Sequence, residues 1–297
     1  MDPANLLDPL AVRRQFARRA LRAGPDGFIL REVERRMLEH LELTRIDPGV
    51  IVDLGCGRGH GLLELRARYP AASLVGIDLI EASARAAQAA VAPRRGLIAR
   101  LRGASSGPAV QVVVADIGAL PLATSSLGLA WSNLALNWCH DVPTVLGEWH
   151  RSLRPGGLVM FSAFGVDTLR ELRAAGALMM PFPDMHDLGD ALVGAGFADP
   201  VMDMERIDLT YASAAALLDE VRALGGNARR DRARGLQSPA RRRQWEERIS
   251  AGASADGRIN LSFEVIYGHA WVPEVKRRAD GAATVEFRRP PPRGEKT

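Results

Sequence analysis

The sequence predicts an α/β fold in which a mostly parallel sheet is covered by helices on both faces. Short apolar runs such as VIVDL (50–54) and SLVGID (73–78) are each followed by a segment with helical periodicity. Glycine or proline turns separate these units along the chain. Parallel neighbours in a sheet need crossover connections, so strands that alternate with helices are typical of this fold class.

The size and composition of the chain fit a folded globular protein. The 297 residues are 47% hydrophobic and 25% charged, which excludes a wholly disordered or collagen-like chain. No apolar run approaches the roughly 20 residues of a membrane span, and the N-terminus lacks the pattern of a secretion signal. Cys56 and Cys139 lie far apart without CxxC spacing, so neither a disulfide framework nor a cysteine-built zinc site is expected. We therefore expect a cytoplasmic protein.

Two helices are expected before the first strand, because residues 9–23 and 28–43 carry apolar residues at helical spacing around a Gly24-Pro25 break. After the strand at 50–54 we expect a helix at 62–69, a strand at 73–78, a helix at 81–91, strands at 110–116 and 128–134, a helix at 142–153 and a strand at 158–165. Further on we expect helices at 167–175, 185–195, 213–224 and 239–249, and strands at 201–211 and 259–268. Residues 94–108 are expected to form a surface loop.

These elements suggest three regions. Residues 1–47 form a helical cap, residues 48–271 the main domain, and residues 272–297 a basic, flexible tail that ends in RRPPPRGEKT.

A glycine-rich turn follows the first strand, in the sequence VDLGCGRG (52–59). Glycines let the backbone approach a ligand closely, and the ligand crevice of an open parallel sheet lies at the carboxyl ends of its strands. His60 occupies the position of the third glycine of a dinucleotide-binding GxGxxG motif, and no GKS or GKT follows the glycines. The turn therefore predicts a ligand without a pyrophosphate group.

Acidic residues end the next two strands. Asp78 suits a carboxylate that accepts hydrogen bonds from both hydroxyls of a ribose. Asp116 is placed to accept from the exocyclic amine of an adenine, with Ile117 beside it to pack on the ring. A single aspartate at a strand end is more often a helix cap. Three of them, with Asp53, in register with the glycine turn favour a ligand site.

These motifs resemble those of the class I methyltransferases, which bind S-adenosylmethionine on a Rossmann-like, seven-stranded, mostly parallel sheet. The match covers DLGCGRG, GID and AD within roughly residues 48–165. Further segments, among them LPLATSSLGLAWSNLALNWCHD (120–141) and LSFEVIYGHAW (261–271), are similar to the malonyl-acyl-carrier-protein O-methyltransferase family of biotin synthesis. The finer resemblance extends from about Val12 to Trp271 and implies an N-terminal helical extension and a C-terminal helical insertion.

The resemblance also implies which residues bind the cofactor. It places Asp53, Gly55, Gly57 and Gly59 around the methionine end of S-adenosylmethionine, Asp78 on the ribose, Asp116 and Ile117 at the adenine, and Asn133 near the sulfonium. Trp138 is a candidate wall of the substrate pocket, with core packing as the alternative.

The chemistry implied by the family is methyl transfer to a malonyl carboxylate, which is already ionised at pH 7 because its pKa lies near ~4. No general base is required, and the rate should come from alignment of the reactants and exclusion of water. An arginine fork is suited to holding the carboxylate. Arg170, Arg173 and Arg222 are the candidates, although arginines on helices are usually only solvated.

Two departures from the family pattern leave the substrate open. The aromatic residue that usually follows FxRRA is absent from Leu21-Arg22-Ala23-Gly24-Pro25, and the usual Phe-Asp pair is Leu127-Gly128. One alternative is a diverged methyltransferase that acts on another acid. A second is a protein-modifying or chaperone-like role, because the related complex I assembly factors, described as arginine hydroxylases, share DTLRELR-like and GGNA-like motifs. The third is a scaffold that binds the cofactor without catalysis.

Arginines cluster near the end of the main domain. Eight lie between Arg229 and Arg248, against three acidic residues. The surplus is either a solvated helix face or a docking surface for an acidic partner. For the family's substrate that partner is the acidic acyl carrier protein, with Arg229, Arg230, Arg241, Arg242 and Arg243 as candidate contacts. Nucleic acid is disfavoured because aromatic residues do not interleave the cluster, and no metal site is expected because the histidines lack paired spacing.

Overall fold

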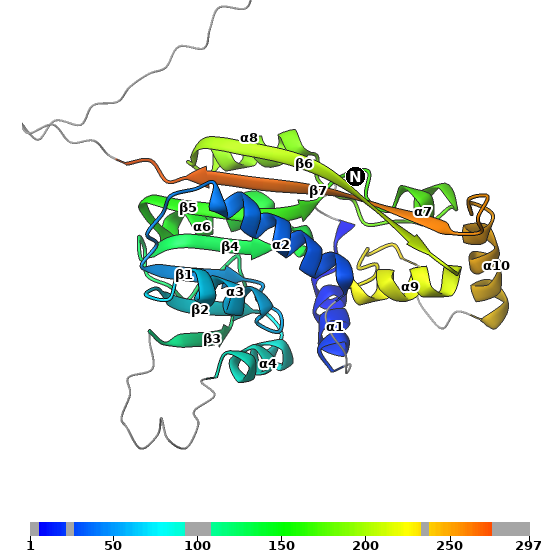
Figure 1. Ribbon diagram of the computed structural model, residues 1–297, viewed down its shortest axis with the longest axis horizontal. Coiled ribbons are helices and arrows are strands. Elements are labelled where there is room, and N and C mark those ends of the chain that lie inside the picture. Colours follow the sequence, from blue (N-terminus) through cyan, green and yellow to red (C-terminus); the bar gives the residue numbers. More distant parts are fainter. Residues whose placement is uncertain (1–5, 22–26, 93–107, 233–237, 275–297) are drawn as a thin grey trace, which may run out of the picture.

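The computed structural model describes residues 6–21, 27–92, 108–232 and 238–274, and a seven-stranded sheet forms its centre (Figure 1). The strands are β1 (Val50–Leu54), β2 (Ser73–Asp78), β3 (Val110–Val114), β4 (Leu127–Asn133), β5 (Leu153–Phe164), β6 (Ala198–Tyr211) and β7 (Ile259–Trp271). Their order is β3-β2-β1-β4-β5-β7-β6. Strands β1 to β5 pair in parallel, and β7 runs antiparallel to both β5 and β6. The predicted seven-stranded, mostly parallel sheet is confirmed.

The direction of chain progression changes between β1 and β4. From β1 the chain moves outward through β2 to β3, and it then returns to the other side of β1 to form β4 and β5. Such a switch point opens a crevice at the carboxyl ends of the strands. The glycine turn that follows β1 lies at this point.

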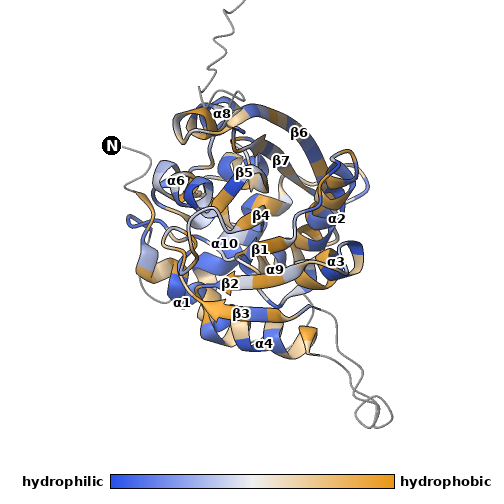
Figure 2. Ribbon diagram, turned by 90° about the vertical axis from the view of Figure 1, so that its left-hand side faces the viewer, coloured by the Kyte–Doolittle hydropathy of each residue, from blue (hydrophilic) through white to orange (hydrophobic). Residues whose placement is uncertain are grey.

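Helices cover both faces of the sheet (Figure 2). They are α1 (Pro9–Ala20), α2 (Phe28–Glu42), α3 (His60–Arg68), α4 (Glu81–Val91), α6 (Val142–Ser152), α7 (Arg170–Ala174), α8 (Met185–Gly194), α9 (Ala214–Ala223) and α10 (Pro239–Ser250). Helices α2 and α3 lie on one face and α6 and α8 on the other, while α9 and α10 form the insertion between β6 and β7. Within the described residues, none of these helices combines the length and hydropathy needed to cross a membrane.

Alternate residues of the central strands enter two separate cores. Trp131 of β4 is fully buried on the side of α2, where it belongs to the same cluster as Val33 and Met37. Its neighbour Ala130 points to the opposite face, into the cluster that contains Trp149 of α6. Because both faces of the sheet are buried, its central strands are apolar almost without interruption.

Several element bounds differ by two or three residues from those expected from sequence, and three differences have a clear local cause or add an element. Strand β5 starts at Leu153, because Leu153 pairs with Leu127 and the register then shifts across the Pro155-Gly156-Gly157 segment. Helix α7 starts only at Arg170, because Leu169 is in the left-handed conformation with φ 58°. A short 3-10 helix, η2 (Leu136–Trp138), follows β4. Three expected features lie mainly outside the described residues. They are the loop at 94–108, the tail after residue 274, and the segment 21–25, where the family usually has its lid aromatic.

The GGNA segment (225–228) attaches α1 to the rest of the molecule. The backbone N–H of Asp8 donates to the Ala228 carbonyl at 2.9 Å, and Gln15 Nε2 donates to the Asn227 carbonyl at 2.8 Å. Gly225 has φ +116°, and a Cβ there would lie 2.8 Å from the Trp138 ring. Helix α1 thus lies between α4 and α9, across the carboxyl ends of the strands (Figure 1).

Gly128 is required by the packing of β4 against the turn before β1. A Cβ at Gly128 would overlap the backbone carbonyl of Pro48, whereas the adjacent Leu127 is buried in the core. We expect Gly128→Ala to lower the free energy of unfolding by about 1–3 kcal/mol. The clashing atoms belong to the Pro48 backbone, which cannot move aside as the end of a flexible side chain could. Urea denaturation measures the change. Gly147→Ala on α6, where the space is open, should instead be neutral or stabilising by about 0.5–1 kcal/mol. Equal stability of the Gly128 variant and the unaltered protein would contradict this account.

Candidate active site

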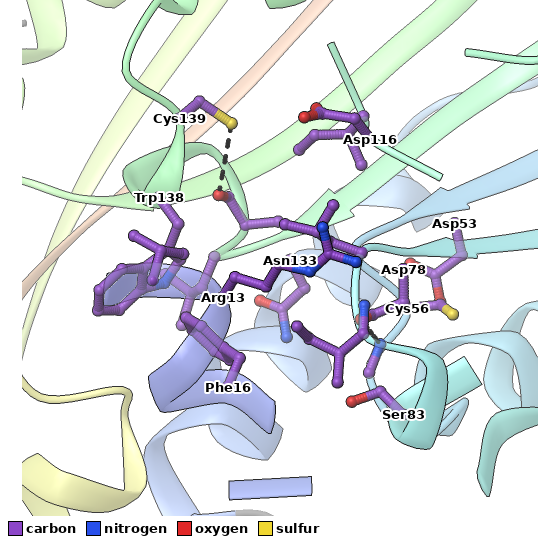
Figure 3. A pocket seen from close by; sticks show the side chains of 18 of the residues that line it. Arg13, Phe16, Asp53, Cys56, Asp78, Ser83, Asp116, Asn133, Trp138 and Cys139 are labelled. Atoms are coloured by element: carbon purple, nitrogen blue, oxygen red, sulfur yellow. Dashed lines mark hydrogen bonds between the residues drawn. The ribbon is translucent and has the colours of Figure 1, made fainter. Parts of the chain in front are cut away.

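A cleft of about 400 Å³ opens at the carboxyl ends of β1, β2 and β4. The strand ends and the glycine turn form one side, and helices α1 and α2 of the N-terminal extension form the other. Figure 3 shows Asp53, Asp78 and Asp116 on the sheet side and Phe16 with Trp138 on the α1 side. The candidate site residues named from the sequence form the sequence-based set. The cleft brings together these members of it: Asp53, Gly55, Gly57, Asp78, Asp116, Ile117, Asn133 and Trp138.

The glycine turn adopts backbone conformations that only glycine takes readily. Gly55 and Gly57 have φ +81° and +53°. A Cβ at Gly55 would also lie 2.5 Å from the Ala135 side chain, on the wall of the cleft. The turn therefore leaves open space beside bare backbone where side chains would otherwise stand.

Asp78 is held in one orientation by the backbone. Its Oδ2 accepts a hydrogen bond from the Gly57 N–H at 2.9 Å, and its Oδ1 accepts one from the Ile80 N–H at 2.8 Å. Burial raises the pKa of Asp78, and these two hydrogen bonds partly offset that increase. Each carboxylate oxygen keeps a further lone pair for a ligand in the cleft.

Asp116 and Ile117 form the far end of the cleft. Asp116 Oδ1 accepts a hydrogen bond from the Gly118 N–H at 2.8 Å, which leaves Oδ2 without a described partner. The Trp149 Nε1–H donates to the Ile117 carbonyl at 2.9 Å and so fixes the backbone of Ile117. The pair presents an acceptor beside an apolar side chain, a combination suited to the edge and face of a purine.

Asn133 connects three elements at the bottom of the cleft. Its Nδ2 donates to the Leu30 carbonyl of α2 at 3.0 Å, and its Oδ1 accepts from the Ser162 hydroxyl of β5 at 2.8 Å. Both polar groups of the side chain are thus used in holding α2 against the sheet. Asn133 lines the cleft, but its side chain acts mainly as a structural link.

Trp138 stands at the opposite end of the cleft. Its ring meets that of Phe16 edge to face, with centroids 4.9 Å apart. Leu224 also lines this end. The structure thus places Trp138 in the cleft wall, as the substrate-pocket interpretation expects, and joins it to α1.

Four residues of the sequence-based set do not line the cleft. Gly59 lies where α3 meets α4, and a Cβ there would be 3.0 Å from the Ala87 backbone. Arg173 donates to backbone carbonyls of its own loop, Val166 and Thr168. Arg170 pairs with Glu171, and Arg222 pairs with Asp219 on the outer face of α9. No residue of α7 or α9 lines the cleft, and helical periodicity alone could not reveal this.

The sequence-based set omitted the contribution of the N-terminal helices. Arg13 and Phe16 of α1, Arg31 and Glu34 of α2, and His60 of α3 all line the cleft. One signal was present in the sequence: Glu34 is an acidic residue directly beside the apolar stripe of α2 that contains Val33 and Met37. No comparable signal marks Arg13, because α1 carries arginines on several faces.

The strand order, the glycine turn and the cleft at the carboxyl ends together define a class I methyltransferase fold. Residues 52–161 match the family described as "Methyltransferase domain". The chain belongs to the malonyl-[acyl-carrier protein] O-methyltransferase family. It is 41% identical over 293 residues to the family member of Methylovorus sp. (strain MP688), with 96% of each chain covered. It is 43% identical over 300 residues to that of Laribacter hongkongensis (strain HLHK9), with 97% of this chain and 98% of the relative covered.

Solved structures support the fold assignment. The YcgJ protein of Bacillus subtilis superposes with a TM-score of 0.56 at 14% identity, over 82% of this chain and 99% of that one. The putative methyltransferase of Haloferax volcanii, solved with the Trm112 activator, gives 0.55 at 18% identity, over 90% of this chain and all of the other.

Proposed function

We propose that the protein transfers the methyl group of S-adenosylmethionine to the free carboxylate of malonyl-acyl carrier protein, in biotin precursor synthesis. The observation that best supports this is the family membership, with relatives of that name matched over nearly their full length. The cleft adds independent support, because it combines a glycine turn with carboxylates at the ends of three adjacent strands.

The residues of the cleft fit S-adenosylmethionine, which supplies an activated methyl group when bound. Asp78 would accept from the ribose hydroxyls through lone pairs that Gly57 and Ile80 leave open. Asp116 and Ile117 suit the adenine. Asp53 is buried without a hydrogen-bond donor among the described residues, and a positively charged ligand would compensate it.

At the other end of the cleft the chain offers a cation for the substrate carboxylate. Arg13 reaches from α1 into the cavity (Figure 3), and among the described residues it forms none of the hydrogen bonds or ion pairs that occupy Arg170, Arg173 and Arg222. Phe16 and Trp138 border the same space. We assign Arg13 the role of holding the malonyl carboxylate, whose ionised oxygen needs alignment and a dry environment but no base.

Methyl transfer from labelled S-adenosylmethionine to malonyl-, glutaryl- and free-acid acceptors tests this function. We expect transfer to malonyl-acyl carrier protein. Arg13→Gln should raise KM for that acceptor about tenfold, the loss of one charge-assisted contact, while the affinity for S-adenosylhomocysteine stays unchanged. Arg14→Gln, one position along α1 and absent from the cleft lining, is the matched control. Tight cofactor binding without transfer to any acceptor would contradict the proposed reaction and favour a scaffold.

The arginine cluster offers a docking surface for the acidic carrier protein. Arg241, Arg242 and Arg243 are exposed on α10, and among them Arg242 pairs with Glu246. Arg229 is already engaged, by Asp231 and by the Met179 carbonyl, and Arg230 Nε donates to the Leu7 carbonyl. We therefore propose that α10 makes the main contact with the carrier protein, and that Arg230, which is exposed beside the start of α1, makes a secondary contact.

Reversing the three charges on α10 tests this surface. Replacement of Arg241, Arg242 and Arg243 by Glu should weaken carrier-protein binding at least about tenfold at low salt, where exposed charges act most strongly. The effect should shrink as salt rises, and cofactor binding should not change. The matched control reverses the exposed charges of Arg35, Arg85 and Arg154, which lie on other elements. Equal losses in both triple variants would indicate a general charge effect instead of a docking surface.

A further inference from the structure

Helix α2 presents two opposite charges to the cleft. Arg31 and Glu34 are three residues apart, so they stand on one side of the helix, one turn from each other. Both line the cleft. The hydrogen bond from Asn133 to the Leu30 carbonyl fixes this turn of α2 against the end of β4. The backbone that carries the two charged side chains is therefore held against the sheet.

Glu34 is buried although it is acidic, with 6% of its surface exposed. Its Oε2 lies 2.5 Å from His60 Nδ1. Its Oε1 faces Gly61 in the first turn of α3, and Asp53 Oδ2 faces the same glycine. A Cβ at Gly61 would lie 2.5 Å from Glu34 Oε1 and 2.9 Å from Asp53 Oδ2. Two carboxylate oxygens thus lie within 3 Å of one point beside Gly61, which lines the cleft.

Asp53 completes the acidic pair and has no donor of its own. It is 3% exposed, lines the cleft and accepts no hydrogen bond from the described residues. Burying an ionised carboxylate without a hydrogen-bond donor lowers the stability of the folded protein, and repulsion from a second carboxylate nearby lowers it further. A ligand with several N–H donors and a positive charge removes both penalties, and an ammonium group has three such donors.

Arg31 supplies the complementary charge at the mouth of the cleft. It is exposed and has no ion-pair partner among the described residues. Its charge acts on the neighbouring His60, where it opposes the increase in the pKa of His60 that the contact with Glu34 causes. A guanidinium is suited to a two-oxygen contact with a carboxylate. An ammonium site and a carboxylate site one helical turn apart match the two charges of an α-amino acid.

We propose that α2 forms the subsite for the amino-acid end of the cofactor, with Glu34 and Asp53 binding its ammonium group and Arg31 its carboxylate. This assignment rests on the proposed use of S-adenosylmethionine. His60 is a positioning residue: it holds Glu34 Oε2 and so directs Oε1 toward the ligand. The N-terminal extension is then part of the cofactor site as well as a cover over it.

Calorimetric binding of three ligands to the purified protein tests the assignment without measuring activity. S-adenosylhomocysteine carries both charges, its decarboxylated aminopropyl analogue carries only the ammonium, and 5′-methylthioadenosine carries neither. Glu34→Gln should weaken the first two ligands about tenfold and leave the third unchanged, since one charge-assisted contact is lost. Arg31→Gln should weaken only S-adenosylhomocysteine by a similar factor.

Matched controls lie on the solvent side of the same helix. Arg35 and Glu39 pair with each other there, so Arg35→Gln and Glu39→Gln should bind all three ligands as the unaltered protein does. Equal weakening of all three ligands by Glu34→Gln, or of none, would overturn the subsite. If the unaltered protein binds neither S-adenosylhomocysteine nor 5′-methylthioadenosine, the cofactor proposal itself fails. If the unaltered protein binds them and the variants bind equally well, only the subsite assignment fails.

Discussion

Replacement of Asp78 by Ala should reduce the affinity for S-adenosylhomocysteine by about 100-fold or more. A carboxylate that accepts from two ribose hydroxyls contributes two charge-assisted hydrogen bonds, each worth about 1.5–3 kcal/mol, and every 1.4 kcal/mol is about tenfold in affinity. The substitution also frees the N–H groups of Gly57 and Ile80, which Asp78 now holds at 2.9 and 2.8 Å. The glycine turn then keeps only its backbone hydrogen bonds from Gly55 and Cys56 to the Ile77 carbonyl of β2, and the looser turn adds to the loss of affinity.

Two further variants separate these effects. Asp78→Asn keeps the shape and one acceptor oxygen but lacks the charge, so we expect an intermediate loss of affinity. Glu81→Gln alters an exposed acid three residues further on, at the start of α4, whose partner is Arg85; its affinity should not change. Calorimetry gives the affinities, and urea denaturation checks that each variant is folded. Binding by Asp78→Asn within twofold of the unaltered protein would show that the ribose is held elsewhere.

The strand ends of the cleft could be predicted from sequence because their signal is local. Each acidic residue directly follows an apolar run, and parallel strands bring those ends to one edge whatever the details of packing. The glycine turn is equally local, since Gly55 and Gly57 need positive φ in any protein with this turn. These features account for the cofactor side of the site.

The other wall of the cleft depends on contacts between segments far apart in the chain. Helix α1 is held by the segment after α9, through pairs such as Gln15 with Asn227, and no spacing rule predicts such docking. For the same reason the sequence favoured Arg170, Arg173 and Arg222, which point elsewhere, and did not single out Arg13. Local conformation explains the short α7, because the left-handed Leu169 is invisible to periodicity.

Asp53→Asn should increase the stability of the ligand-free protein while it weakens cofactor binding. Burial, together with the negative charges of Glu34 and Asp78, raises the pKa of Asp53 well above its ordinary value of 3.8. The folded protein therefore holds the Asp53 proton more tightly than the unfolded chain does. The stability that this contributes is complete below pH 3.8 and is lost as the pH rises through the raised pKa. The unaltered protein therefore loses this stability as the pH rises, whereas asparagine is neutral at every pH.

We expect the free energy of unfolding of Asp53→Asn to exceed that of the unaltered protein by about 1–2 kcal/mol at pH 7, and the difference to vanish toward pH 4, as urea denaturation at both values will show. The affinity for S-adenosylhomocysteine should fall about tenfold to 100-fold at pH 7, because a buried charge no longer faces the ligand's ammonium. The affinity of the unaltered protein should also rise with pH above 4 more steeply than that of the variant, since Asp53 must be ionised to bind a cation. The residues around Asp53 are the same in both proteins, so the difference between the two pH profiles reports on Asp53. A variant that is less stable than the unaltered protein at pH 7 would contradict this prediction. It would show that Asp53 stabilises the fold, whereas we expect a ligand-binding residue that lowers stability.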